Sequence, residues 1–284
     1  MTRGGARWGL ALLVGVAVLA IGAPRLAPVG PSDSTDIVTT RFLPPGSIDD
    51  AGVVHLLGTD RLGRDVWSRL IHGARVSLAV GALATLVSLG IGVLAGGLAA
   101  LAPSPLSTVV LGFTDFALAL PRVVLLLLLA ALWEPSALLV ILTLGFTGWM
   151  PIARLVYAET SSLLGRPYLT AGQALGGGRR HLFLRHVLPN AAPSLLAAVT
   201  LGVGNAITLE AGLSFLGLGV QPPTPSWGSL IASGRETVVN APWVGLAPGL
   251  ALVLVVVACT LIADDFESRA HPDRHQLAGA GLER

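Results

Sequence analysis

The sequence predicts an all-α, polytopic membrane protein with six transmembrane helices, and composition is the first reason. Of its 284 residues, 53% are hydrophobic and 12% are charged, with a mean hydropathy of +0.75. An ordinary soluble domain carries about twice that share of charged residues. So few polar groups could not cover a water-facing surface, which argues against a soluble enzyme, and the apolar surplus excludes a disordered chain.

The second reason is the length of the apolar stretches. A bilayer core about 30 Å thick takes about 20 residues of helix, whereas a spanning strand needs only about 10. Six stretches meet the helical length or come close to it: residues 8–23, 76–101, 106–133, 136–157, 191–218 and 242–263. The first is short and follows two arginines, as in a cleaved signal peptide, but the five later spans favour an uncleaved helix.

Arginine counts predict the orientation of these spans. The side that holds both termini and the connection between the fourth and fifth spans carries ten arginines, and the other side carries seven. Basic residues are enriched in cytoplasmic loops, so both termini are expected in the cytoplasm.

The segment before the second span has its own pattern. Residues 62–78 repeat apolar side chains at helical spacing, with charged residues on the opposite face. This predicts an amphipathic helix that lies on the membrane surface and turns into the second span; a straight extension of that span into water is the alternative. The chain then divides into residues 1–75 (first helix, extracytoplasmic connection and surface helix), 76–266 (transmembrane core) and 267–284 (cytoplasmic tail).

The connection between the fourth and fifth spans is basic, with four arginines against Glu159. Two helix candidates, residues 168–175 and 179–188, are separated by three glycines, and Pro189 ends the second. A helix, a glycine turn and a helix predict a protruding knob whose small residues let another protein approach closely. A solvated basic loop is the alternative.

Three blocks of this sequence resemble one family. Residues 170–189 resemble the cytoplasmic loop of ATP-binding-cassette (ABC) importer permeases, Glu-Ala-Ala, three residues, Gly, nine residues, Ile, one residue, Leu-Pro. Gly176 and Leu188-Pro189 match that pattern, whereas Thr170 and His186 depart from it. Residues 55–78 and 210–231 narrow the resemblance to the dipeptide, oligopeptide and nickel branch, in its second-permease type.

The resemblance implies a permease in the bacterial cytoplasmic (inner) membrane that carries di- or oligopeptides or a related small solute, with nickel or another metal chelate as the alternative. The implied partners are a sister permease in a heterodimer, two ABC ATPase subunits, an extracytoplasmic substrate-binding protein and the lipid bilayer, with no nucleic acid. ATP-driven closure of the ATPases would move a helix in the loop and swing the spans between two states. The residues expected to form this ATPase-coupling loop are Ala171, Ala174, Leu175, Gly176, Arg179, Leu182 and Pro189.

Residues for catalysis are missing from the sequence. The chain has no lysine, so it cannot form a G-x-x-x-x-G-K-[ST] phosphate loop, and ATP must bind to partner subunits. A single cysteine and no Cys/His cluster predict neither a metal nor a cofactor site. All six histidines lie outside the spans, which argues against an intramembrane enzyme.

Asp115, Arg122 and Glu210 are charged residues inside the spans and are candidates for lining the translocation path. Asp115 and Arg122 share one helix face about 10 Å apart, and a kink at Pro121 would bring them closer. A structural pair or a contact with the sister permease is the alternative. An ATP-independent secondary transporter is a further possibility, but so few charges and no inverted repeat argue against it.

Overall fold

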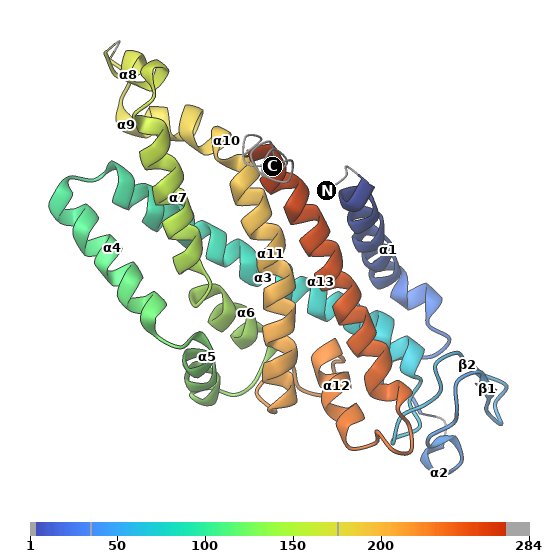
Figure 1. The fold of residues 1–284 in the computed structure, drawn as a ribbon. Helices are drawn as coiled ribbons and strands as arrows, with labels where there is room; N and C mark the ends of the chain where they lie inside the picture. The colour runs from blue at the N-terminus through green and yellow to red at the C-terminus, as the bar shows by residue number, and fades with distance from the viewer. Residues whose placement is uncertain (1–3, 35, 175, 271–284) are drawn as a thin grey trace, which may run out of the picture.

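The computed structural model describes residues 4–34, 36–174 and 176–270. Long helices dominate it (Figure 1). Four are single long helices: α1 (Gly4–Leu26), α3 (Val66–Leu101), α11 (Ala192–Phe215) and α13 (Trp243–Ala270). The other two expected spans are each built from two helices: α4 (Ser104–Ala119) with α5 (Arg122–Ala131), and α6 (Ala137–Phe146) with α7 (Trp149–Leu164). In this described part of the chain five helical stretches could cross a membrane by length and composition, or six if the bent α4–α5 pair counts as one span.

The third span breaks where the sequence has its proline. The backbone at Leu120 and Pro121 is extended, and α5 leaves α4 at 84°. Proline lacks the N–H that a helix needs and disfavours helical geometry in the residue before it, so α4 cannot continue through this point. The sharp turn separates Arg122 from the helix face that carries Asp115.

The second span begins earlier than the sequence predicts. α3 runs unbroken for 36 residues, about 54 Å at 1.5 Å per residue, from a capping bond between the Asp65 carboxylate and the Ser68 N–H (2.7 Å). Residues 66–78 of the expected amphipathic helix are continuous with the second span, and the boundary drawn after residue 75 falls inside α3. Ser68 and Arg69 on the polar face of this segment are buried by other parts of the chain.

The extracytoplasmic connection folds onto the outer ends of the helices. It contains α2 (Ile37–Thr40) and an antiparallel pair of short strands, β1 (Ser47–Ile48) and β2 (Val54–His55), in which Ser47 pairs with His55. The short α12 (Trp227–Arg235) packs against α13, α11 and α3, and the indole N–H of its Trp227 donates to the Leu70 carbonyl of α3 (3.1 Å). Figure 1 places these elements at the end opposite both described termini.

Small residues set the distances between the long helices. An added Cβ at Gly81 of α3 would lie 2.6 Å from Ile207 of α11, and one at Gly92 would lie 2.7 Å from Ile152 of α7. Because lipid provides no hydrophobic drive for association, close backbone approach of this kind is what holds membrane helices together. α3 is thereby the shared partner of α7 and α11.

Candidate coupling loop and translocation pocket

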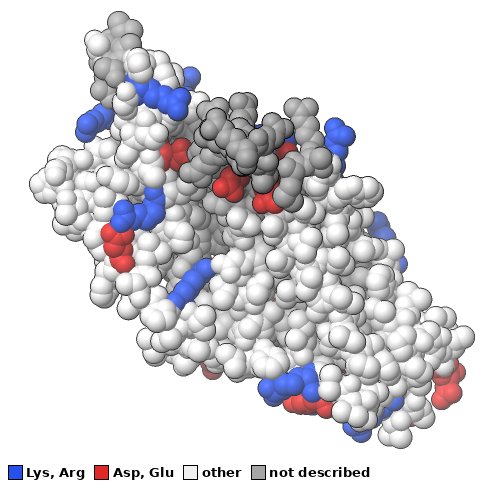
Figure 2. Space-filling view, in the orientation of Figure 1, with Lys and Arg blue, Asp and Glu red and all other residues white. Residues whose placement is uncertain are grey.

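The connection between α7 and α11 projects past the ends of the long helices, on the side where both described termini lie (Figure 1). It consists of α8 (Pro167–Ala174), α9 (Arg179–Leu182), a π-helical turn η1 (Phe183–Val187) and α10 (Leu188–Asn190). Arginine side chains gather around it in Figure 2. The connection therefore has the helix, turn and helix order that the sequence predicts.

Buried apolar side chains fasten this loop to the spans. Leu169, Leu182, Phe183 and Val187 are buried in one cluster together with residues of α7 and α11. The Phe183 ring also lies against α3, where an added Cβ at Gly97 would approach it to 2.8 Å. The loop is thus held by three helices at once and can move only with them.

Hydrogen bonds and glycines shape the turn inside the loop. Gly176 has φ +90°, which side-chain-bearing residues rarely adopt, and the Gly177 N–H donates to the Gly172 carbonyl (3.0 Å). Arg179 donates to the Leu101 carbonyl at the end of α3 (3.1 Å), one of the carbonyls that a helix leaves unpaired. Arg179 therefore links the start of α9 to the end of α3.

The residues expected to form the coupling loop divide into an outer and an inner group. Ala174, Gly176, Arg179 and Pro189 are exposed, whereas Leu182 is 3% exposed and points inward. Leu175 and the side chain of Ala171 lie outside the described residues. Leu169, Phe183 and Val187 are missing from the expected set, although apolar residues inside a basic segment are a signal that could have found them.

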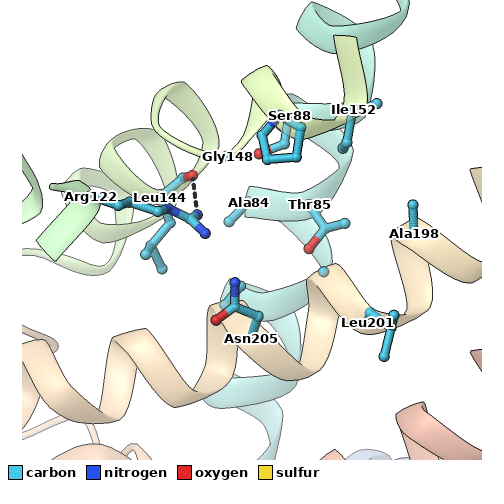
Figure 3. A pocket seen from close by; sticks show the side chains of 13 residues that line it. Ala84, Thr85, Ser88, Arg122, Leu144, Gly148, Ile152, Ala198, Leu201 and Asn205 are labelled. Atoms are coloured by element: carbon cyan, nitrogen blue, oxygen red, sulfur yellow. Dashed lines mark hydrogen bonds between the residues drawn. The ribbon is translucent and has the colours of Figure 1, made fainter. Parts of the chain in front are cut away.

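A pocket of about 260 Å³ lies midway along the bundle. It is bordered by α3, α11, the start of α5 and the break between α6 and α7 (Figure 3). Its polar residues are Thr85, Ser88, Arg122 and Asn205, and most of the remaining lining is apolar. Arg122 is the one sequence candidate for the path that this pocket contains.

Arg122, the first residue of α5, reaches across to the end of α6. Its Nη2 donates to the Leu144 carbonyl (3.3 Å) and its Nε to the Thr147 hydroxyl (3.5 Å). Gly148 gives it room, because an added Cβ there would lie 3.0 Å from Nη2 and would collide with the Ser88 hydroxyl. The break between α6 and α7 therefore receives the guanidinium.

Asp115 does not pair with Arg122. It accepts from Arg154 of α7 instead (Nε to Oδ1, 2.7 Å), and the two side chains are 50% and 40% exposed, respectively. The proximity that the spacing of Asp115 and Arg122 predicts is lost because Pro121 turns α5 away from α4. Asp115 belongs to an ion pair on the outer face of α4 and α7.

Glu210 is 0% exposed and is not part of the pocket lining. Its carboxylate accepts from the hydroxyls of Ser214 (2.7 Å), Ser226 (2.8 Å) and Ser77 (3.4 Å). The Ser77 hydroxyl in turn accepts from the backbone N–H of Trp227 (3.0 Å). The geometry matches the structural alternative, in which Glu210 joins α3, α11 and α12 by hydrogen bonds that stabilise a buried polar group.

A bundle of membrane-crossing helices with an internal pocket and an anchored loop on the side of both termini defines a polytopic membrane permease. Residues 88–271 match the family described as "Binding-protein-dependent transport system inner membrane component". The chain belongs to this family, which is one of transport permeases and not of enzymes. It is accordingly a multi-pass membrane protein.

Curated relatives agree with this assignment, and a solved structure shares the fold. The chain is 38% identical to the di/tripeptide transport system permease protein DppC of Pseudomonas aeruginosa, over 94% of this chain and 88% of that protein. It is 32% identical to the dipeptide transport system permease protein DppC of Haemophilus influenzae, over 96% and 92%. A chain of the inward-facing MetNI methionine ABC transporter shares the fold, with a TM-score of 0.58 and 20% identity over 72% of this chain and 95% of that one.

Proposed function

We propose that this chain is a permease subunit of a peptide importer in the bacterial cytoplasmic membrane and that ATP hydrolysis on partner subunits drives it. The peptide class rests on the relatives named above as dipeptide and di/tripeptide permeases. The observation that carries the coupling role is the basic loop between α7 and α11, fastened to three spans and projecting on the side of the termini.

The proposed partners bind at opposite ends. Two ATPase subunits hold the ATP, so this chain carries no cofactor, and one of them receives the exposed side of α8 and the glycine turn. A sister permease completes a heterodimer in the bilayer. An extracytoplasmic binding protein delivers its cargo at the end formed by α12 and the β1–β2 hairpin. The family description supports a binding protein as a general feature.

The loop and the pocket share their supporting helices, which makes the coupling mechanical. Ile152 of α7 belongs both to the cluster that holds the loop and to the lining of the pocket. α3 and α11 likewise contact the loop near one end and line the pocket further along. A docked ATPase that shifts α8 and α9 would therefore displace three walls of the pocket together.

Ala174→Glu tests this role, because Ala174 is exposed on α8 and its replacement disturbs no buried contact. In the complete complex reconstituted in proteoliposomes, we expect substrate-stimulated ATP hydrolysis and uptake to fall at least ~10-fold, as a charge is forced into a close protein contact. Gly176 is a poorer test site, since at φ +90° any side chain strains the turn.

The matched control is Ser104→Glu, which places the same charge at an exposed position at the start of α4, outside the loop. It should leave stimulation at the wild-type level. Normal stimulation in Ala174→Glu would remove the coupling role from this loop. Uptake that persists in proteoliposomes without any ATPase subunit would instead identify a secondary transporter.

A further inference from the structure

Arg122 carries a charge at the pocket that no acid balances within the described part of the chain. Among the described residues it forms no ion pair, and its two hydrogen bonds go to neutral acceptors, the Leu144 carbonyl and the Thr147 hydroxyl. A guanidinium has five N–H donors, so most of them remain available. A charged side chain inside a membrane span is costly, and such residues are usually paired or used for function.

The surroundings of Arg122 favour an anion in the pocket. The described lining residues include no aspartate or glutamate, and Glu210 is held away from the pocket by its serine hydroxyls. The Thr85 and Ser88 hydroxyls already donate to the Gly81 and Gly145 carbonyls. These two hydroxyls are therefore not the donors that an incoming group would meet first.

Asn205 supplies a second free donor. In the described part of the chain its side-chain amide forms no hydrogen bond, although it is exposed to the pocket from α11. Figure 3 shows the Asn205 amide and the Arg122 guanidinium extending from opposite walls into the same space. Two convergent donors, one of them cationic and capable of a bidentate contact, are the arrangement that recognises a carboxylate.

We infer that Arg122 and Asn205 form a subsite for a carboxylate group of the transported solute. If the proposed function holds, that group is the C-terminal carboxylate of a short peptide. A volume of about 260 Å³ fits a small solute, and the apolar walls formed by residues such as Ala84, Leu201 and Ile152 would accept varied side chains. The carboxylate would supply the missing counter-charge for Arg122 while the solute occupies the pocket.

The test measures ligand binding to the purified complex of this permease with its sister permease and the ATPases, without the binding protein. The probes are dialanine, which has a free carboxylate, and dialanine amide, which has none. We expect wild type to bind dialanine at least ~10-fold more tightly than the amide, since a charge-assisted contact typically has that effect. Arg122→Gln should abolish the difference, and Asn205→Ala should reduce it.

Two further variants sharpen the result. Arg122→Lys keeps the charge but loses the planar fork, so it should retain part of the preference for dialanine. Arg75→Gln removes an exposed arginine from α3 outside the pocket and should bind both probes as wild type does. The ligand-free complex with Arg122→Gln should melt close to the wild-type temperature.

Several results would overturn the subsite: no binding of dialanine to wild type, equal binding of both probes, or unchanged binding in Arg122→Gln. A large drop in melting temperature with equal loss of both probes would show that Arg122 only fastens α5 to α6. ATP-dependent uptake of dialanine by the complete system tests the proposed function separately. That uptake together with equal binding of both probes would refute the subsite and leave the proposed function standing.

Discussion

Asp60 offers a sharp test of how the extracytoplasmic connection is held together. Its side chain is 2% exposed and accepts from the backbone N–H groups of Leu62 (2.8 Å) and Arg64 (3.1 Å). Nε and Nη2 of Arg64 lie 2.8 and 2.7 Å from its Oδ2, and Nε of Arg69 lies 3.6 Å from the same atom. One carboxylate therefore serves two arginines and the turn that precedes α3.

Asp60→Asn changes the charge and almost nothing else. The amide oxygen can still accept from the two backbone N–H groups, but Arg64 and the buried Arg69 lose their counter-charge. Removing one partner of a buried ion pair costs about 3–5 kcal/mol. At 1.4 kcal/mol per factor of ten, local opening of the connection should become roughly a hundredfold to a few thousandfold more frequent.

Hydrogen exchange measures that opening directly. The amides of Arg64 and Val66 are bonded within this turn, the latter to the Gly58 carbonyl (3.0 Å), so both should exchange faster by about this factor. Asp50→Asn makes the same change at an exposed site and should leave exchange unaltered. Exchange in Asp60→Asn within about threefold of wild type would refute the reasoning, because it is far below the expected range.

Three other changes have equally direct outcomes. Glu210→Leu leaves the Ser77 and Ser226 hydroxyls without their acceptor, whereas Glu210→Gln keeps an oxygen that can accept from them. The melting temperature of the complex should therefore be lower with Leu than with Gln, and equal melting temperatures would show that these hydrogen bonds do not stabilise the contact of α3, α11 and α12. Leu182→Ala should cost about 2–5 kcal/mol and speed tryptic cleavage within the loop, and an unchanged cleavage rate would rule out the anchor. Gly148→Ala should weaken dialanine binding as Arg122→Gln does, because the added Cβ would crowd the Arg122 guanidinium. Gly112→Ala is the control, since an added Cβ there meets nothing within 4 Å, and it should bind as wild type does. Equal binding by both variants would show that the space at Gly148 is not needed to place Arg122.

Hydropathy predicts the spans well because the bilayer requires apolar side chains at every lipid-facing position. The expected ranges 8–23, 191–218 and 242–263 correspond closely to α1, α11 and α13. Where a span ends outside the bilayer, that constraint stops. The sequence therefore misplaces the start of α3, because the helical pattern of residues 62–78 cannot show that Ser68 and Arg69 are covered by other parts of the chain.

The site was harder to predict because its contacts join residues far apart in the chain. Pro121 indicates a kink, but only the 84° angle between α4 and α5 shows that Asp115 and Arg122 do not lie close together. The partner of Asp115 is Arg154, 39 residues away, and Glu210 meets Ser77 from 133 residues away. Spacing along one helix cannot report such pairs, whereas the glycine turn of the loop, which is local, could be predicted.

α3 connects the separate parts of this permease. Along its unbroken length it meets the outer connection at Asp65, the Glu210 joint at Ser77, the pocket at Thr85 and Ser88, and the loop at Gly97. The two helix breaks, after α4 and after α6, both border the pocket. In the proposed coupling, α3 would transmit a movement of the loop between α7 and α11, and the two interrupted spans would absorb it beside the pocket that contains Arg122.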